Sequence, residues 1–92
     1  MELSSRVVRA EGTPSAEVDD EVVLLPPSLE SYLALDAIGS RVWALLEHPR
    51  RVEELCATLS REFDAGAEEI GRDVLGFLDQ LEDQGLVRVL ED

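Results

Sequence analysis

The feature of this sequence that most constrains its fold is a change in the spacing of apolar residues near Asp36. Before it, apolar residues come in short β-type runs that turn residues interrupt. After it, apolar residues recur every three or four positions, which is the period of an amphipathic helix. The change predicts an α+β fold in which a small antiparallel sheet is followed by three helices.

The N-terminal part of the chain predicts three short strands, at residues 6–9, 21–25 and 31–35. Breaks are expected at Gly12-Thr-Pro-Ser15 and at Pro26-Pro27-Ser28, because proline cannot donate a hydrogen bond to a sheet. The three strands are expected to form one antiparallel sheet.

The rest of the chain predicts three helices. The first begins after Asp36, an aspartate suited to capping a helix N-terminus, and runs to about Glu47. The second covers 52–63, and the third covers 66–85 and ends at a glycine that favours a left-handed conformation. The tail, 86–90, predicts a short final strand or an extended segment beside the third helix.

Length and composition predict one domain spanning residues 1–92, since a chain of this size forms a single core. The 45% hydrophobic content is too high for a disordered chain, and the apolar runs are too short to cross a membrane. No secretory signal is visible, so a cytoplasmic location is expected. A lone Cys56 and a lone His48 argue against a disulfide, a zinc site or another cofactor.

Charge bears on the partners of this chain. Eight arginines and 21 acids give a net charge of −13, which repels nucleic acid and anionic lipid. Three helices after a small sheet resemble a winged helix-turn-helix module, a topology that DNA-binding proteins share with protein-binding adaptors. The third helix, 66–85, carries six acids against Arg72 alone, a charge unsuited to contacting phosphates. The expected partner is therefore a protein or peptide with basic patches.

Motifs for catalysis are missing from the sequence. It has no glycine-rich phosphate loop, no nucleophile elbow and no cluster of metal-ligand residues. Acidic pairs such as Glu68 and Glu69 are neighbours that point in different directions on a helix, so they do not form an acid/base couple. We expect a protein that is not an enzyme.

Four stretches of the sequence together resemble the PqqD-like family of recognition elements for ribosomally synthesised, modified peptides (RiPPs). These stretches are Tyr32 to Leu46, Pro49 to Leu55, Arg72 to Leu78 and Gln84 to Val87. The resemblance covers about residues 20–88. The sequence departs from the family in the turn at 26–30 and in the residues Arg51 and Gly66, where a better helix cap is usual.

The resemblance implies a non-catalytic adaptor that binds the leader segment of a precursor peptide. In this family the leader adds a strand to the edge of the third strand and lies against the third helix, a mode known as β-augmentation. On this basis the peptide-binding residues are expected to be Ser31, Tyr32, Leu33, Ala34 and Leu35 of the strand and some of Ile70, Asp73, Val74 and Phe77 of the helix.

The resemblance also implies partners. A lasso-peptide pathway with a leader peptidase and a macrocyclase is our first expectation, and a radical-SAM pathway resembling that of pyrroloquinoline quinone is the second. Two other classes stay open: a winged-helix DNA-binding regulator, and a subunit that dimerises through its open sheet edge.

Several candidate residues also have a purely structural interpretation. The apolar residues of the third helix have core spacing, and Trp43 is expected to be a core residue, as is Cys56. Leu75 lies roughly 100° from the apolar stripe on a helical wheel and is the better candidate for an exposed apolar contact.

Overall fold

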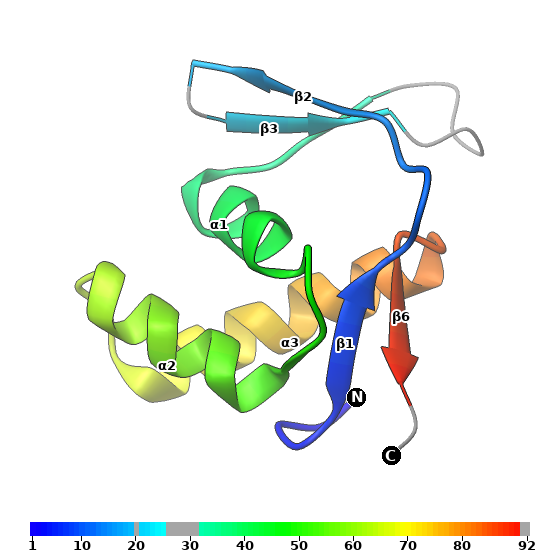
Figure 1. Ribbon diagram of the computed structural model, residues 1–92. Helices are drawn as coiled ribbons and strands as arrows, with labels where there is room; N and C mark the ends of the chain where they lie inside the picture. The colour runs from blue at the N-terminus through cyan, green and yellow to red at the C-terminus, as the bar shows by residue number, and fades with distance from the viewer. Residues whose placement is uncertain (20, 26–31, 91–92) are drawn as a thin grey trace.

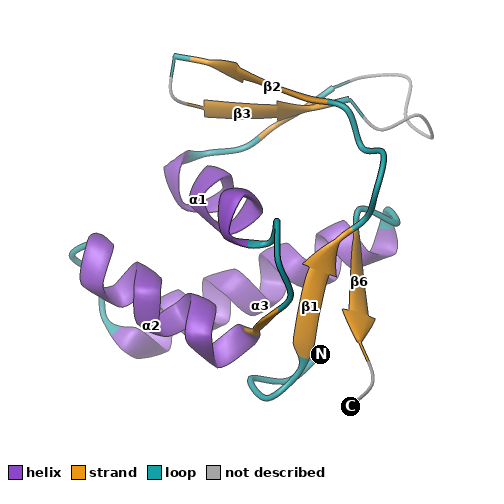
Figure 2. Cartoon of the chain, in the orientation of Figure 1, coloured by secondary structure: helices purple, strands orange, loops and turns teal. Residues whose placement is uncertain are grey.

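The computed structural model describes residues 1–19, 21–25 and 32–90 of the chain, and Figure 1 shows their arrangement. Helices and short strands are packed so that two small sheets lie on different sides of the helices (Figure 2). The elements in chain order are β1 (Arg6–Arg9), β2 (Ser15–Val18), β3 (Glu21–Leu24), β4 (Leu33–Ala34), α1 (Ala37–Leu45), β5 (Arg50–Arg51), α2 (Val52–Glu62), α3 (Ala67–Asp83) and β6 (Val87–Leu90).

The α+β class, with a three-stranded antiparallel sheet and three helices, is confirmed. The membership of that sheet is not as predicted: its order is β2-β3-β4, and β1 lies instead in a second sheet of order β5-β1-β6. The strand β2 was missed because its four residues alternate only weakly, with Ala16 and Val18 as the apolar members, and all four are exposed. The break predicted at residues 12–15 is therefore wrong at its C-terminal end.

The second sheet contains the C-terminal tail, whose strand prediction is confirmed. The tail strand β6 pairs along the whole of β1, from Arg6 opposite Leu90 to Arg9 opposite Val87. Both Val7 and Val87 are buried against the helices. Pairing with residues about 80 positions away could not be read from local periodicity, and this is why β1 was placed in the wrong sheet.

The helices form where their apolar stripes predict, and they contain most of the core. The carboxylate Oδ1 of Asp36 accepts a 2.7 Å hydrogen bond from the Gly39 N–H, so the predicted N-cap of α1 is confirmed. The left-handed residue after α3 is Gly85, with φ +74°. Trp43 is a core residue, as predicted, whereas Cys56, also predicted to lie in the core, is only partly buried. The buried core residues are Val7, Val22, Leu24, Leu35, Val42, Trp43, Leu46, Val52, Leu55, Leu59, Ile70, Val74, Leu78, Leu81, Leu86 and Val87.

The buried hydroxyl of Ser40, in α1, joins the sheet to the helix. It accepts a 2.8 Å hydrogen bond from the Val22 N–H of β3 and donates a 3.2 Å bond to the Leu35 carbonyl just after β4. The serine thus satisfies two buried backbone groups at once, which would otherwise be costly to bury. This bridge fixes the position of β4 relative to α1.

Candidate functional site

Strand β4 has an open edge. Within the described part of the chain it pairs with β3 alone, because the sheet order is β2-β3-β4. Edge strands present backbone N–H and C=O groups that can pair with another strand. The open edge of β4 is therefore a possible docking site for an extended segment.

The hydrogen-bond pattern shows which backbone groups face that open edge. The Leu35 N–H donates a 2.8 Å bond to the Val22 carbonyl of β3. Leu33, two residues before Leu35, is paired with Leu24 of β3. Because bonding alternates along an antiparallel strand, the N–H and C=O of Ala34 point away from β3. By the same alternation the backbone of Tyr32 also points toward the open edge.

A small cavity of about 180 Å³ lies between β4 and α3. Leu33 and Leu35 lie on the same face of the strand, because side chains two apart share a face, and Leu35 is buried in the core. From α3, the ring of Phe77 reaches over the start of α1, where its Cζ lies 3.2 Å from the position that a Cβ would occupy on Gly39. The residues lining the cavity are Leu33, Ala34, Leu35, Asp36, Phe77, Gln80, Leu81 and Gln84.

The structure brings together four of the nine residues that the sequence suggested: Leu33, Ala34, Leu35 and Phe77 line one cavity. A fifth, Tyr32, is next to them in the chain, and its side chain is 66% exposed. Ser31 lies outside the described residues.

The remaining three suggested residues lie on α3 outside the lining of the cavity. Asp73 is exposed one turn before Phe77, on the side of the helix that faces β4. Ile70 and Val74 are core residues, exposed by 2% and 1%. A docked segment could not contact their buried side chains without repacking the core.

Two residues that the sequence reasoning missed, Gln80 and Gln84, complete the wall of the cavity. They follow Phe77 at i+3 and i+7, so they lie on its side of α3. The search for an apolar stripe passed over them because they are polar. The side-chain Oε1 of Gln84 is buried and has no hydrogen-bond partner among the described residues. Because this oxygen is enclosed, the Gln84 side chain must turn before it can accept a bond from a docked segment.

The site offers backbone groups and apolar surface rather than catalytic groups. Among the described residues, no three His, Cys, Asp or Glu side chains are placed to hold a metal ion. The described helices include none that is long and apolar enough to span a membrane. What the site can do is bind an extended segment through main-chain hydrogen bonds and a few side-chain contacts.

Comparisons with known proteins relate this chain to a protein family and to a solved structure. Residues 21–87 match the family described as "Coenzyme PQQ synthesis protein D (PqqD)". Among solved structures, the chain resembles "TbiB1 in Complex with the TbiA(beta) Leader Peptide", with 36% sequence identity and a TM-score of 0.79. That alignment covers 92% of this chain and 99% of the other. The comparison with curated proteins gave no match.

Proposed function

Because this chain belongs to the PqqD family, we propose that it is an adaptor that binds the leader segment of a ribosomally made precursor peptide. The open edge of β4 beside the α3 cavity carries the proposal. The similarity to TbiB1, whose structure was solved with a leader peptide, supports it. In this function the chain acts as one leader-binding domain over residues 1–92 and performs no chemistry itself.

The leader adds a strand to the sheet. Its backbone pairs with the outward N–H and C=O groups of Tyr32 and Ala34, which gives affinity that does not depend on leader sequence. Successive leader side chains then point to opposite sides of the sheet. Those on the α3 side enter the cavity and contact Leu33 and Phe77, which gives sequence preference.

The residues of α3 have different parts in this binding. Phe77 supplies apolar contact, and Gln80 and Gln84 supply amide groups for leader polar atoms. Asp73, exposed on the same side of the helix, is placed to pair with a leader cation near the cavity. Ile70 and Val74 hold the helix against the core and are not contacts.

The bound leader is delivered to separate maturation enzymes. Holding the leader raises the local concentration of the rest of the precursor at their active sites. We favour a lasso-peptide pathway, with a leader peptidase and a macrocyclase as cytoplasmic partners, because small separate members of the family serve that pathway. The second candidate is a radical-SAM enzyme pathway like that of pyrroloquinoline quinone. We also propose that the three helices and the β1–β6 pair form a winged helix-turn-helix module, used here for peptide binding.

The test is a titration of fluorescently labelled leader peptides, taken from precursor genes near that of this protein, by fluorescence polarisation. We expect sub-micromolar binding that is lost when a proline replaces the central residue of the leader, since proline removes a backbone donor. A DNA duplex serves as the control and is expected not to bind. Failure of every leader to bind would contradict the proposal.

A further inference from the structure

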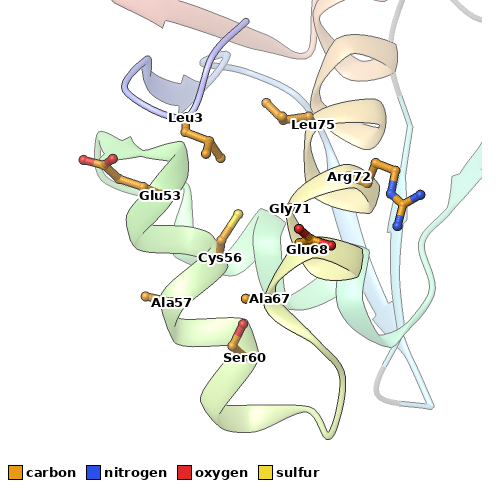
Figure 3. A pocket seen from close by; sticks show the side chains of 10 residues that line it. All are labelled: Leu3, Glu53, Cys56, Ala57, Ser60, Ala67, Glu68, Gly71, Arg72 and Leu75. Atoms are coloured by element: carbon orange, nitrogen blue, oxygen red, sulfur yellow. The ribbon is translucent and has the colours of Figure 1, made fainter.

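A second hollow on the described surface is separate from the leader cavity. It is a groove of about 790 Å³ between α2 and α3, and Figure 3 shows its lining from close by. Leu3 and Leu75 lie at one end, and Cys56 and Ser60 of α2 point toward α3. The residues lining it are Leu3, Glu53, Cys56, Ala57, Ser60, Ala67, Glu68, Gly71, Arg72 and Leu75.

The lining of the groove is mainly apolar, and its charged members are Glu53, Glu68 and Arg72. The side chain of Leu3 is 47% exposed, and Leu75 is partly buried at the groove wall. Burial raises the pKa of the Cys56 thiol, which agrees with an environment poor in polar groups. A concave surface that is mostly apolar suits a partner with an apolar face.

The groove lies on the other side of α3 from the leader cavity. Around the helix, Gly71 and Leu75 are roughly 160° from Phe77 and Gln80, with the core stripe between the two sets. An occupant of the groove and a leader on β4 would therefore both contact α3 without overlapping. An adaptor that joins a peptide to another protein requires two separate surfaces of this kind.

The geometry indicates that the occupant is a helix. The walls are two helices whose backbone groups are already hydrogen-bonded internally, so the groove offers no strand edge to an extended segment. An occupant of the groove must therefore form its own backbone hydrogen bonds internally, as a helix does. The lining on α2 runs from Glu53 to Ser60, or about 10 Å, which matches roughly two turns of a docked helix.

The charges indicate what kind of helix. Glu53 lies in the first turn of α2 and Glu68 in the first turn of α3, so the lining carries two carboxylates against the one guanidinium of Arg72. The whole chain has a net charge of −13. A second copy carries the same net charge of −13, so two copies would repel one another across a symmetric interface. A helix with Lys or Arg beside its apolar face is complementary to this groove.

We propose that the groove between α2 and α3 docks a helix of the protein partner that receives the leader, and that this helix has an apolar face flanked by basic residues. The identity of the partner as the receiver of the leader rests on the proposed function. The docking site itself does not, since it is argued from the groove alone.

Two glycines of α3 provide a matched pair of variants. Neither Gly71 nor Gly76 has any atom within 4 Å of the position that a Cβ would take, so both accept a side chain without strain. Gly71 lines the groove, and Gly76 is exposed and lines neither hollow. Gly71→Arg fills the groove and repels a basic helix, whereas Gly76→Arg makes the same change of charge elsewhere on the helix.

The probe is a synthetic 18-residue amphipathic helix of leucine and lysine, compared with the same peptide in which glutamate replaces lysine. Binding is followed by backbone NMR shifts of the full chain. We expect the lysine peptide to shift the amides of Ala57, Ser60 and Gly71. We also expect Gly71→Arg to weaken binding at least tenfold, with Gly76→Arg within twofold of the wild type.

The same samples are titrated with leader peptide, so that the two proposals fail separately. We expect both variants to bind leader within twofold of the wild type. The groove proposal is overturned by equal weakening in the two variants, by shifts spread over the acidic surface, or by equal binding of the glutamate peptide. A wild-type dimer in sedimentation that Gly71→Arg dissociates would also overturn it, because the occupant would then be a second copy.

Discussion

Replacement of Ser40 by alanine tests how the docking strand is held. The change removes the hydroxyl that bonds the Val22 N–H and the Leu35 carbonyl. Each lost bond costs about 1 kcal/mol, and two buried backbone groups are left without partners. Alanine has the better helix propensity by roughly 0.5 kcal/mol, which offsets part of this loss. We expect a net loss of about 2 kcal/mol in unfolding free energy, or on the order of 10 °C in Tm for a chain of this size.

The control for this variant is Ser60→Ala. Its hydroxyl is also buried on a helix, but it has no hydrogen-bond partner among the described residues, so the change keeps the propensity gain without the loss of a hydrogen bond to those residues. Urea unfolding followed by circular dichroism gives both free energies, and we expect an unchanged m-value. We also expect Ser40→Ala to bind leader more weakly than Ser60→Ala, because β4 loses its anchor. Equal stabilities of the two variants would refute the bridging role of Ser40.

Three further predictions concern single side chains. Phe77→Ala is expected to weaken leader binding at least tenfold, whereas Leu75→Ala, on the other flank of α3, leaves it within twofold; equal effects in a polarisation titration would contradict the placement of the leader. The Arg41 guanidinium, 2.7 Å from Glu62, lowers the pKa of that carboxyl below its ordinary 4.5. A carboxyl group whose pKa is lowered in the folded state stabilises the fold at pH values above its ordinary pKa. This stabilisation is lost as the pH falls through the lowered pKa. The difference in unfolding free energy between wild type and Glu62→Gln should therefore shrink below about pH 4.5. A difference in urea titrations that does not shrink at all as the pH is lowered from about 7 to the most acidic pH at which the protein stays folded would count against this pair. Because burial raises the pKa of Cys56, its alkylation by iodoacetamide should reach half its maximal rate at a higher pH than that of free cysteine, and an equal or lower midpoint would be inconsistent with the apolar groove.

Local signals were enough to find the helices. Apolar spacing located α1, α2 and α3, and the chemistry of Asp36 identified a true N-cap. These features depend on residues within one or two turns of each other, and a periodicity argument uses only such residues.

The sheets depend on distant residues, and there the sequence was insufficient. Strand β1 pairs with β6 from the other end of the chain, and β2 has no buried residue to give it a pattern. The candidate site shows the same limit. Spacing alone could not separate Phe77, which lines the cavity, from Ile70 and Val74, which the core encloses. Gln80 and Gln84 become site candidates only when β4 is seen beside α3.

The most direct measurement of strand addition is amide hydrogen exchange at β4 by NMR, with and without leader peptide. The Leu35 N–H is bonded to β3, so we expect it to be protected in both states. The Ala34 N–H points to the open edge, so it should exchange fast in the free protein and become protected when the leader pairs with it. If a saturating leader leaves the Ala34 amide unprotected, the leader does not bind as an added strand.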